Sequence, residues 1–205
     1  MASPPRTPGG HRERLLAAMA VSIEQKGYRD TSVADVVGIA RTSRRTYYEH
    51  FNDRDACFLA LFDSTSEEMM SEIARAVRAD ASLEEQVDAA VGSYLDGVAA
   101  RPELFRSFTR ELPALGRPAV DRERAVIERF AALLVALVES GRREHADVDA
   151  RPLSRDAALV IVGGLRELTV SAFEQRRDMS ELRVTAVGVV KAILGAAVLE
   201  PAAAV

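Results

Sequence analysis

Side chains that can bind nucleic acid lie close together between Arg44 and His50, in the sequence RRTYYEH. Arginine presents a rigid fork of donors that can bond O6 and N7 of guanine together, and it can also neutralise a phosphate. A threonine can bond a base edge or touch a thymine methyl, and a tyrosine hydroxyl or a histidine suits phosphate oxygens. These residue types favour a DNA-reading surface. The alternative is that the arginines are solvated charges on an ordinary helical hairpin.

The apolar residues before this cluster predict a short helix. Thr31 or Ser32 can cap it, because a hydroxyl can accept from an unpaired N–H, and Asp35 lies three residues after Ser32. The apolar stripe of this helix has the spacing i, i+3, i+4, i+7 and consists of Val33, Val36, Val37 and Ala40.

A turn near Arg41 and Thr42 leads to a second short helix, which Ser43 can cap. Tyr47 and Phe51 are four residues apart, so they should face the core together. The residues between and beside them are left to project outward. Two helices with a short turn, the second carrying the polar set in its N-terminal half, predict a helix-turn-helix.

The run T-S-V-x-D-V, then A-x-x-S, then T-x-Y-x-H-F, then x-x-R-D resembles the N-terminal DNA-binding domain of the tetracycline-repressor family, over roughly residues 11–62. The resemblance implies double-stranded operator DNA as a partner. The positions that match operator contacts on the recognition helix are Ser43, Arg44, Arg45, Thr46, Tyr48 and His50. Those that match contacts to backbone phosphate are Thr31, Ser32 and Arg54.

Two positions depart from the family pattern. Arg41 stands where the turn usually carries glycine, and Arg45 stands where the recognition helix often has a small residue. A non-glycine residue in the turn needs a negative φ, or it carries a left-handed cost of about 1–2 kcal/mol. Arg45 is expected to add a base or phosphate contact. These departures bear on the operator sequence rather than on the class of protein.

The composition fits a helical DNA-binding protein. The 205 residues allow one or two small domains, and 48% of them are apolar, which suffices for a substantial core. Residues 1–51 carry 8 Lys and Arg against 5 Asp and Glu, whereas the remaining residues carry a net charge of −7. A mildly basic head on an acidic body suits a protein whose head alone approaches DNA.

A single cysteine, Cys57, excludes an intramolecular disulfide and a zinc cluster. On a helix it is expected to be a small buried side chain rather than a redox switch. No metal or cofactor is predicted. No signal peptide and no run of roughly 20 apolar residues is visible, so we expect a cytoplasmic protein without a membrane segment.

The predicted fold is all-α, with about nine helices. Residues 1–10 are expected to form a disordered tail, residues 11–53 the helix-turn-helix domain, and residues 54–205 a helical effector-binding and dimerisation domain. A first helix should begin near His11 and end at Gly27, and Asn52 or Asp53 can cap the fourth. The later helices are expected at 83–100, from 102, at 120–139 where Gly141 ends the helix, at 154–176 and at 179–199.

The last two predicted helices, within about 154–199, have apolar residues over more of the helix circumference than is typical of a surface helix. The resemblance implies that they pair with their copies in a homodimer, as a four-helix bundle. The alternative is that they only close the core of this chain. A twofold protein would carry two recognition helices to half-sites roughly 34–36 Å apart.

The resemblance also implies a pocket for an unknown small-molecule effector in the body, and a repressor that leaves a palindromic operator when the effector binds. The candidate lining residues are Phe62, Met69, Tyr94, Phe105, Phe108 and Phe130, with Arg110 and Glu111 as polar anchors. Each aromatic residue could instead be ordinary core. The expected effector is apolar or amphipathic.

Two other classes of function remain open. An all-helical enzyme would need a catalytic constellation, but His11, His50 and His145 lie far apart in sequence, and no HExxH, Walker or Glu-x-x-His motif occurs. A protein-binding adaptor would leave the Arg44–His50 pattern and the charge split unexplained. Repressor rather than activator is the default of the family.

Overall fold

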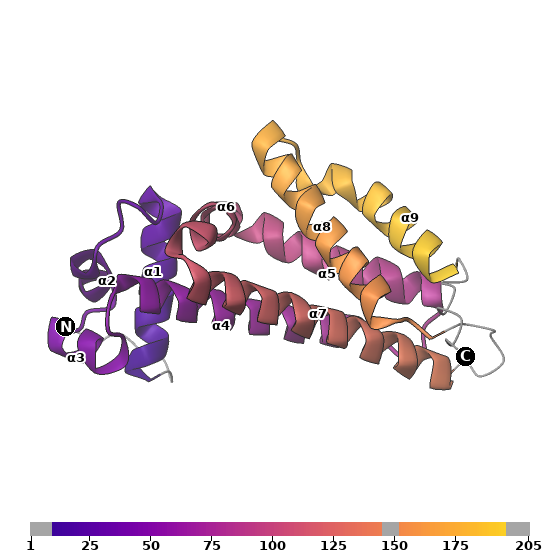
Figure 1. Ribbon diagram of the computed structural model, residues 1–205, viewed down its shortest axis with the longest axis horizontal. Helices are drawn as coiled ribbons and strands as arrows, with labels where there is room; N and C mark the ends of the chain where they lie inside the picture. Colours follow the sequence, from indigo (N-terminus) through magenta and orange to yellow (C-terminus); the bar gives the residue numbers. More distant parts are fainter. Residues whose placement is uncertain (1–9, 145–151, 196–205) are drawn as a thin grey trace, which may run out of the picture. The chain divides into compact units, whose positions relative to one another are not determined.

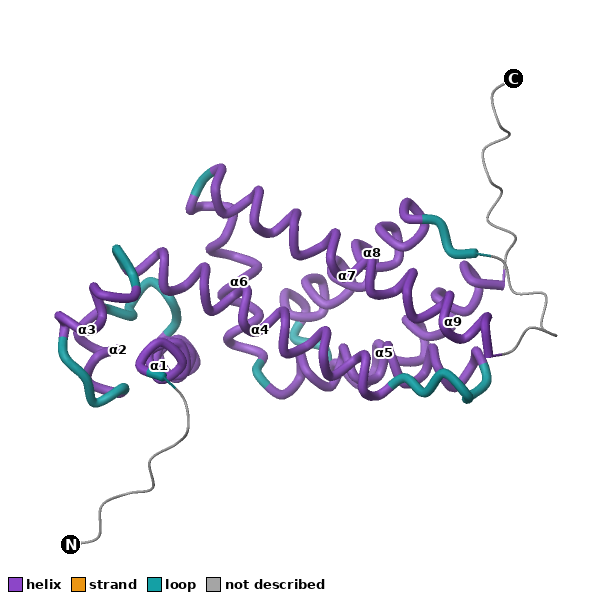
Figure 2. Tube along the Cα trace, turned by 90° about the horizontal axis from the view of Figure 1, so that it is seen from below, coloured by secondary structure: helices purple, strands orange, loops and turns teal. Residues whose placement is uncertain are grey.

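The computed structural model describes residues 10–144 and 152–195, and every regular element in these ranges is helical (Figures 1 and 2). The expected all-α class is therefore confirmed. The chain divides into two compact units. The first comprises Met1–Thr65 with Glu103–Gly116, and the second comprises Ser66–Pro102 with Arg117–Val205.

The α-helices in the described part of the chain are α1 (His11–Lys26), α2 (Val33–Ile39), α3 (Arg44–His50), α4 (Arg54–Ala76), α5 (Leu83–Ala100), α6 (Pro102–Glu111), α7 (Arg117–Glu144), α8 (Arg155–Gln175) and α9 (Leu182–Gly195). Short 3-10 turns occupy Leu112–Leu115 and Met179–Glu181. The predicted tail and the end of the last predicted helix fall largely outside the described residues.

In the first unit, α1, α2 and α3 pack against one another. Tyr47 on α3 is fully buried and its hydroxyl donates to the Asp53 carbonyl at 3.0 Å, which fixes the end of α3. The predicted caps are present. Ser32 forms a capping box with Asp35, and the Ser43 Oγ accepts from the Thr46 N–H at 3.0 Å. These contacts set the direction of the recognition helix.

The helix α4 contributes its first half to the first unit and its second half to the second unit. Asp53 caps it, since its Oδ1 accepts from the Ala56 N–H at 2.6 Å. Cys57 and Phe58 are fully buried on its first turns. The interpretation of Cys57 as a buried side chain is confirmed.

In the second unit, α5 packs against α9, and α7 packs against α8. The predicted end of α7 is wrong, because the helix continues through Gly141 to Glu144. A Cβ on Gly141 would lie 2.6 Å from Oε1 of Gln86. Because Gly141 has no side chain, it leaves room for the amide of Gln86 on α5. It does not end the helix. Within the described residues, no helix is long and apolar enough to cross a membrane.

Candidate nucleic-acid interface

The exposed side of α3 carries the residues predicted to contact DNA. Tyr47 is fully buried, whereas 55% of Tyr48 is exposed, as are Arg44, Arg45 and His50. The alternation follows from helical spacing, because Tyr47 faces the interior of the first unit while its neighbours in sequence face away. The structure thus gathers the predicted polar set on one accessible helix.

The contacts within this set are weak or local. The Arg45 Nε lies 3.3 Å from Oε1 of Glu49, one turn along the helix. Ser43 and Thr46 share a hydroxyl contact at 3.0 Å, and the His50 ring stacks on a histidine of α1. Exposed ion pairs contribute only about 0–1 kcal/mol, so Arg45 can exchange its carboxylate for a phosphate or a base. Within the described residues, Arg44 has no hydrogen-bond, ionic or aromatic partner.

Thr31 cannot serve as the predicted phosphate contact. Its side chain is 1% exposed, and its hydroxyl donates to the Gly27 carbonyl at 2.8 Å and lies 3.0 Å from the Ser22 hydroxyl. Its N–H donates to the Tyr28 carbonyl. Thr31 therefore ties the end of α1 to the loop before α2, which corrects the expectation from sequence. Ser32, the next residue, is exposed and caps α2.

The guanidinium group of Arg54 makes several contacts inside the first unit. Its Nη1 donates to the Thr31 carbonyl at 3.0 Å and to the Arg29 carbonyl at 3.3 Å. The same group lies 4.3 Å from the centre of the Tyr28 ring. The Tyr28 hydroxyl donates to Asp55, and burial together with this bond raises the pKa of Tyr28. Arg54 thus braces the loop that precedes α2, and its contact with phosphate stays a prediction.

Electrostatic contacts also hold the start of α2. The Lys26 Nζ lies 2.7 Å from Oδ2 of Asp35, and Ser32 donates to the same carboxylate through both its N–H and its hydroxyl. The bond from Lys26 and those from Ser32 hold the pKa of Asp35 well below its usual range. The carboxylate therefore stays ionised, and it fixes the entry to the helix-turn-helix.

Residues 15–61, which form this head, match the model of the family described as bacterial regulatory proteins, tetR family. The head of the chain therefore carries the DNA-binding region of the tetR family. It is a DNA-binding transcriptional regulator. No curated protein matches the chain.

Solved structures share the fold of this chain. One is FadR from Bacillus halodurans, a fatty acid degradation regulator, with a TM-score of 0.73, 19% identity and coverage of 95% of this chain and 100% of that chain. Another is FadR from Bacillus subtilis in complex with stearoyl-CoA, with a TM-score of 0.71, 14% identity and coverage of 89% and 97%. A third is the reduced form of E. coli NemR, with a TM-score of 0.71, 18% identity and coverage of 90% and 98%.

The residues predicted to line an effector pocket fall into both units. Phe108 is 4% exposed and lies at the centre of an aromatic cluster in the first unit, with ring centroids 5.3 Å from Phe58, 5.3 Å from Phe62 and 6.0 Å from Phe105. This cluster packs α6 against the first half of α4. Of the predicted polar anchors, Arg110 is exposed, and Glu111 accepts two bonds from Nε of Arg29, each of 3.1 Å.

Met69, Tyr94 and Phe130 belong to the second unit. The Tyr94 hydroxyl lies 3.3 Å from Oγ1 of Thr169, which in turn donates to the Arg166 carbonyl at 2.7 Å. Burial raises the pKa of Tyr94. Met69 is buried, with its Cε near Gly97, and Phe130 is half-buried. Tyr94 is half-buried and its hydroxyl pairs with another hydroxyl, so it has the chemistry of a polar anchor.

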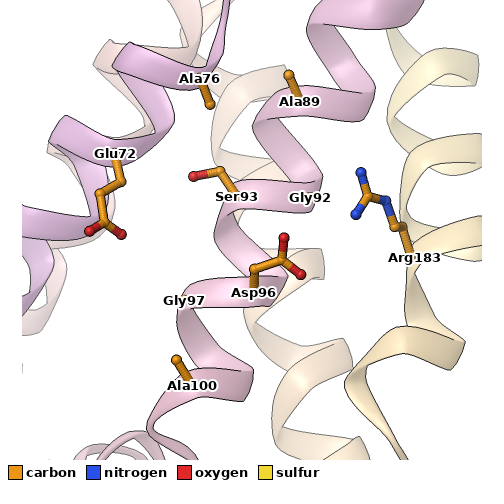
Figure 3. Close-up of a pocket in the computed structure, with 9 residues that line it drawn as sticks. All are labelled: Glu72, Ala76, Ala89, Gly92, Ser93, Asp96, Gly97, Ala100 and Arg183. Atoms are coloured by element: carbon orange, nitrogen blue, oxygen red, sulfur yellow. The ribbon is translucent and has the colours of Figure 1, made fainter.

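An open groove of about 520 Å³ lies between α4, α5 and α9 (Figure 3). Small residues of α5 form its floor, and its charged groups are Glu72, Asp96 and Arg183. Arg183 extends from α9 toward Gly92 on α5, where a Cβ would meet its guanidinium at 2.5 Å. None of the predicted lining residues borders this groove. Its signal in the sequence is the repeat of small residues along α5, at Ala89, Gly92, Ser93, Gly97 and Ala100.

Proposed function

We propose that this chain is a cytoplasmic, homodimeric repressor that binds a palindromic operator and leaves it when a small-molecule effector binds the body. The observation that supports this most directly is the exposed side of α3. That surface presents guanidinium, hydroxyl, phenol and imidazole groups on a helix held by a buried tyrosine and two capped helix starts.

The proposed operator contacts come from α3 and from the starts of α2 and α4. Arg44 and Arg45 are placed for base edges or phosphates, because α3 would enter the major groove with its N-terminal half. Tyr48 and His50, farther along the helix, suit phosphate oxygens. The full proposed set is Ser32, Ser43, Arg44, Arg45, Thr46, Tyr48, His50 and Arg54.

Apolar side chains on α8 and α9 support the proposed homodimer. Val160 on α8 is 65% exposed, and Val184 and Val189 on α9 are 83% and 53% exposed. Gly163 and Gly164 on α8 have open space where a Cβ would stand, so another helix can approach closely. Exposed apolar side chains grouped on neighbouring helices are typical of an interface, and a twofold contact buries them on both subunits together.

The comparisons suggest which effector to test first. Because one FadR structure of similar fold contains stearoyl-CoA, we propose a long-chain acyl-CoA as a candidate effector for this chain. The proposed pocket residues of the second unit, Met69, Tyr94 and Phe130, offer apolar surface for an acyl chain, whereas Phe62, Phe105 and Phe108 pack together in the first unit.

Selection of random duplex DNA by the purified protein, at fixed salt and with sequencing of the bound pool, tests this function. We expect a palindromic motif, and release of the selected duplex when stearoyl-CoA is added but not when coenzyme A is added alone. An unenriched pool from well-folded protein would contradict the repressor. A palindrome that stearoyl-CoA does not release would contradict only the effector.

A further inference from the structure

Arginine occupies a backbone position that favours glycine at the end of α2. The Thr42 N–H donates to the Val37 carbonyl at 3.0 Å, and the Arg41 N–H donates to the Gly38 carbonyl at 3.3 Å. This pair of bonds is a Schellman motif, in which the residue after the cap is left-handed. Arg41 has a φ of 50°, so its backbone is held in a left-handed conformation that costs an L-residue free energy.

A similar left-handed cap ends α8 in the second unit. Arg176 has a φ of 55°, and the Arg177 N–H donates to the Ala172 carbonyl at 2.9 Å. Among the described residues, Arg41 and Arg176 are the two non-glycine residues with positive φ. Arg176 therefore provides a matched site, with the same side chain and the same local geometry outside the DNA-binding head.

Most basic side chains of α1 to α3, and Arg54 at the start of α4, already have a partner in the first unit. Arg45 pairs with Glu49, and Arg54 bonds to carbonyls. The other pairs are Arg12 with Phe51, Arg14 with His11, Lys26 with Asp35 and Arg29 with Glu111. Arg41 and Arg44 are exposed, and within the described residues their guanidinium groups have no partner. A guanidinium without an internal partner can bind phosphate without breaking a contact.

The place of Arg41 in the chain suits the DNA backbone better than a base edge. It lies in the turn, two residues before Ser43 caps α3, so its Cα is at most about 7.6 Å from that of the cap. The recognition helix places its own N-terminal residues against base edges in the major groove. A long side chain from the turn before that helix lies outside the groove, where phosphates line the edge.

We propose that Arg41 is a phosphate anchor of the head, a contact that rests on the proposed DNA-binding function. The left-handed strain at Arg41 is kept because glycine, which would relieve it, cannot supply the charge. Strained residues of this kind concentrate at functional sites. The ligand is a backbone phosphate of the operator, contacted once by each subunit.

The test is the salt dependence of binding to the selected duplex, measured for five proteins. Arg41→Gly relieves the strain and removes the charge, whereas Arg41→Gln removes the charge alone. In both variants, the plot of log K against log salt should become less steep by about 0.9 per lost contact, or about 1.8 for a dimer. Their binding to all DNA sequences should weaken alike. Arg41→Lys and the matched control Arg176→Gly should keep the wild-type slope.

The melting temperature separates folding from binding, because Arg41→Gly and Arg176→Gly should both melt at or above the wild-type temperature. A wild-type slope in Arg41→Gly and Arg41→Gln would overturn the contact. Weakening confined to one base-pair position would also overturn it and make Arg41 a base reader. A wild-type protein that binds no duplex would overturn the proposed function, and the contact with it.

Discussion

Burial determines the chemistry of the lone thiol. Cys57 is fully buried on α4, beneath Tyr47 of the recognition helix. Burial raises the pKa of Cys57 to about 12, although a hydrogen bond with Tyr47 opposes this rise. Because the thiolate is the reactive species, a thiol that keeps its proton at neutral pH is unreactive. Cys57 therefore contributes packing under the helix-turn-helix and not a redox switch.

The free energy of unfolding should fall in alkaline solution because of this thiol. In the unfolded chain the thiol ionises near its ordinary pKa of 9.0, but in the folded chain it stays neutral to about pH 12. The thiol contributes fully to the free energy of unfolding below pH 9. This contribution is lost as the pH rises from about 9 to about 12, with a slope of at most about 1.4 kcal/mol per pH unit. Tyr47 and Tyr28, whose pKa values are also raised, add to the loss at higher pH.

Urea unfolding at pH 8.0 and at several values up to about pH 10 measures this slope. Cys57→Ala serves as the control, since it removes the titrating group while leaving both tyrosines. The variant will be less stable at every pH because a buried side chain is lost, but its decline above pH 9 should be shallower. Equal declines in both proteins would show that Cys57 is not the group responsible.

Among the secondary-structure elements, several helices have a serine at the N-cap. The N-cap of α5 should contribute measurably to the free energy of unfolding. The Ser82 Oγ accepts from the Glu85 N–H, and the Glu85 carboxylate accepts from the Ser82 N–H at 2.9 Å. Ser82→Ala removes half of this capping box and should cost about 1 kcal/mol. Thermal and urea unfolding of the intact protein measure the change.

Ser71→Ala is the matched control for that substitution. Ser71 is exposed within α4, and its hydroxyl has no partner in the described part of the chain. Alanine favours a helix interior, so this change should be neutral or slightly stabilising. If both serines gave the same small effect, the cap of α5 would have no particular role in stability.

The helix starts could be predicted because a cap depends on residues close in sequence. The sequence offers Thr31 or Ser32, Ser43, and Asn52 or Asp53 as caps, and Ser32, Ser43 and Asp53 make the expected bonds. Gly141 misled the prediction because its role depends on Gln86, which lies on another helix. The sequence around a glycine does not tell whether it ends a helix or makes room within one.

The same limit applies to the candidate sites. The outward direction of Arg44, Arg45 and Tyr48 follows from helical spacing, so the exposed side of α3 was predictable. The burial of Thr31 depends on its bond to Ser22 on α1, which no local pattern reveals. For the aromatic residues, periodicity indicates burial but does not separate core from pocket, and Phe108 proved to be the centre of a packed cluster.

At the scale of the whole molecule, the proposed repressor depends on a second subunit. One short recognition helix covers a single half-site, whereas a palindrome presents two of them roughly 34–36 Å apart. A twofold axis supplies the second helix in the matching orientation. The exposed valines of α8 and α9 are the residues from which this requirement can be tested.

Val184→Glu should convert the dimer into a monomer. Val184 is 83% exposed in the single chain, so a carboxylate there is solvated in a monomer, but in the proposed interface it would be buried away from water. Val120→Glu is the matched control, because that valine is 41% exposed on α7 and lies outside the proposed interface. Circular dichroism should show full helix content in both variants.

Sedimentation equilibrium measures the outcome directly, and operator binding measures its consequence. We expect Val120→Glu to remain a dimer, and Val184→Glu to sediment as a monomer and to lose most of its affinity for a two-half-site duplex. Its binding to an isolated half-site should match that of the wild-type protein, because the head is untouched. A dimeric Val184→Glu would show that α9 does not form the interface, and the twofold contact would then have to lie on another face of the second unit.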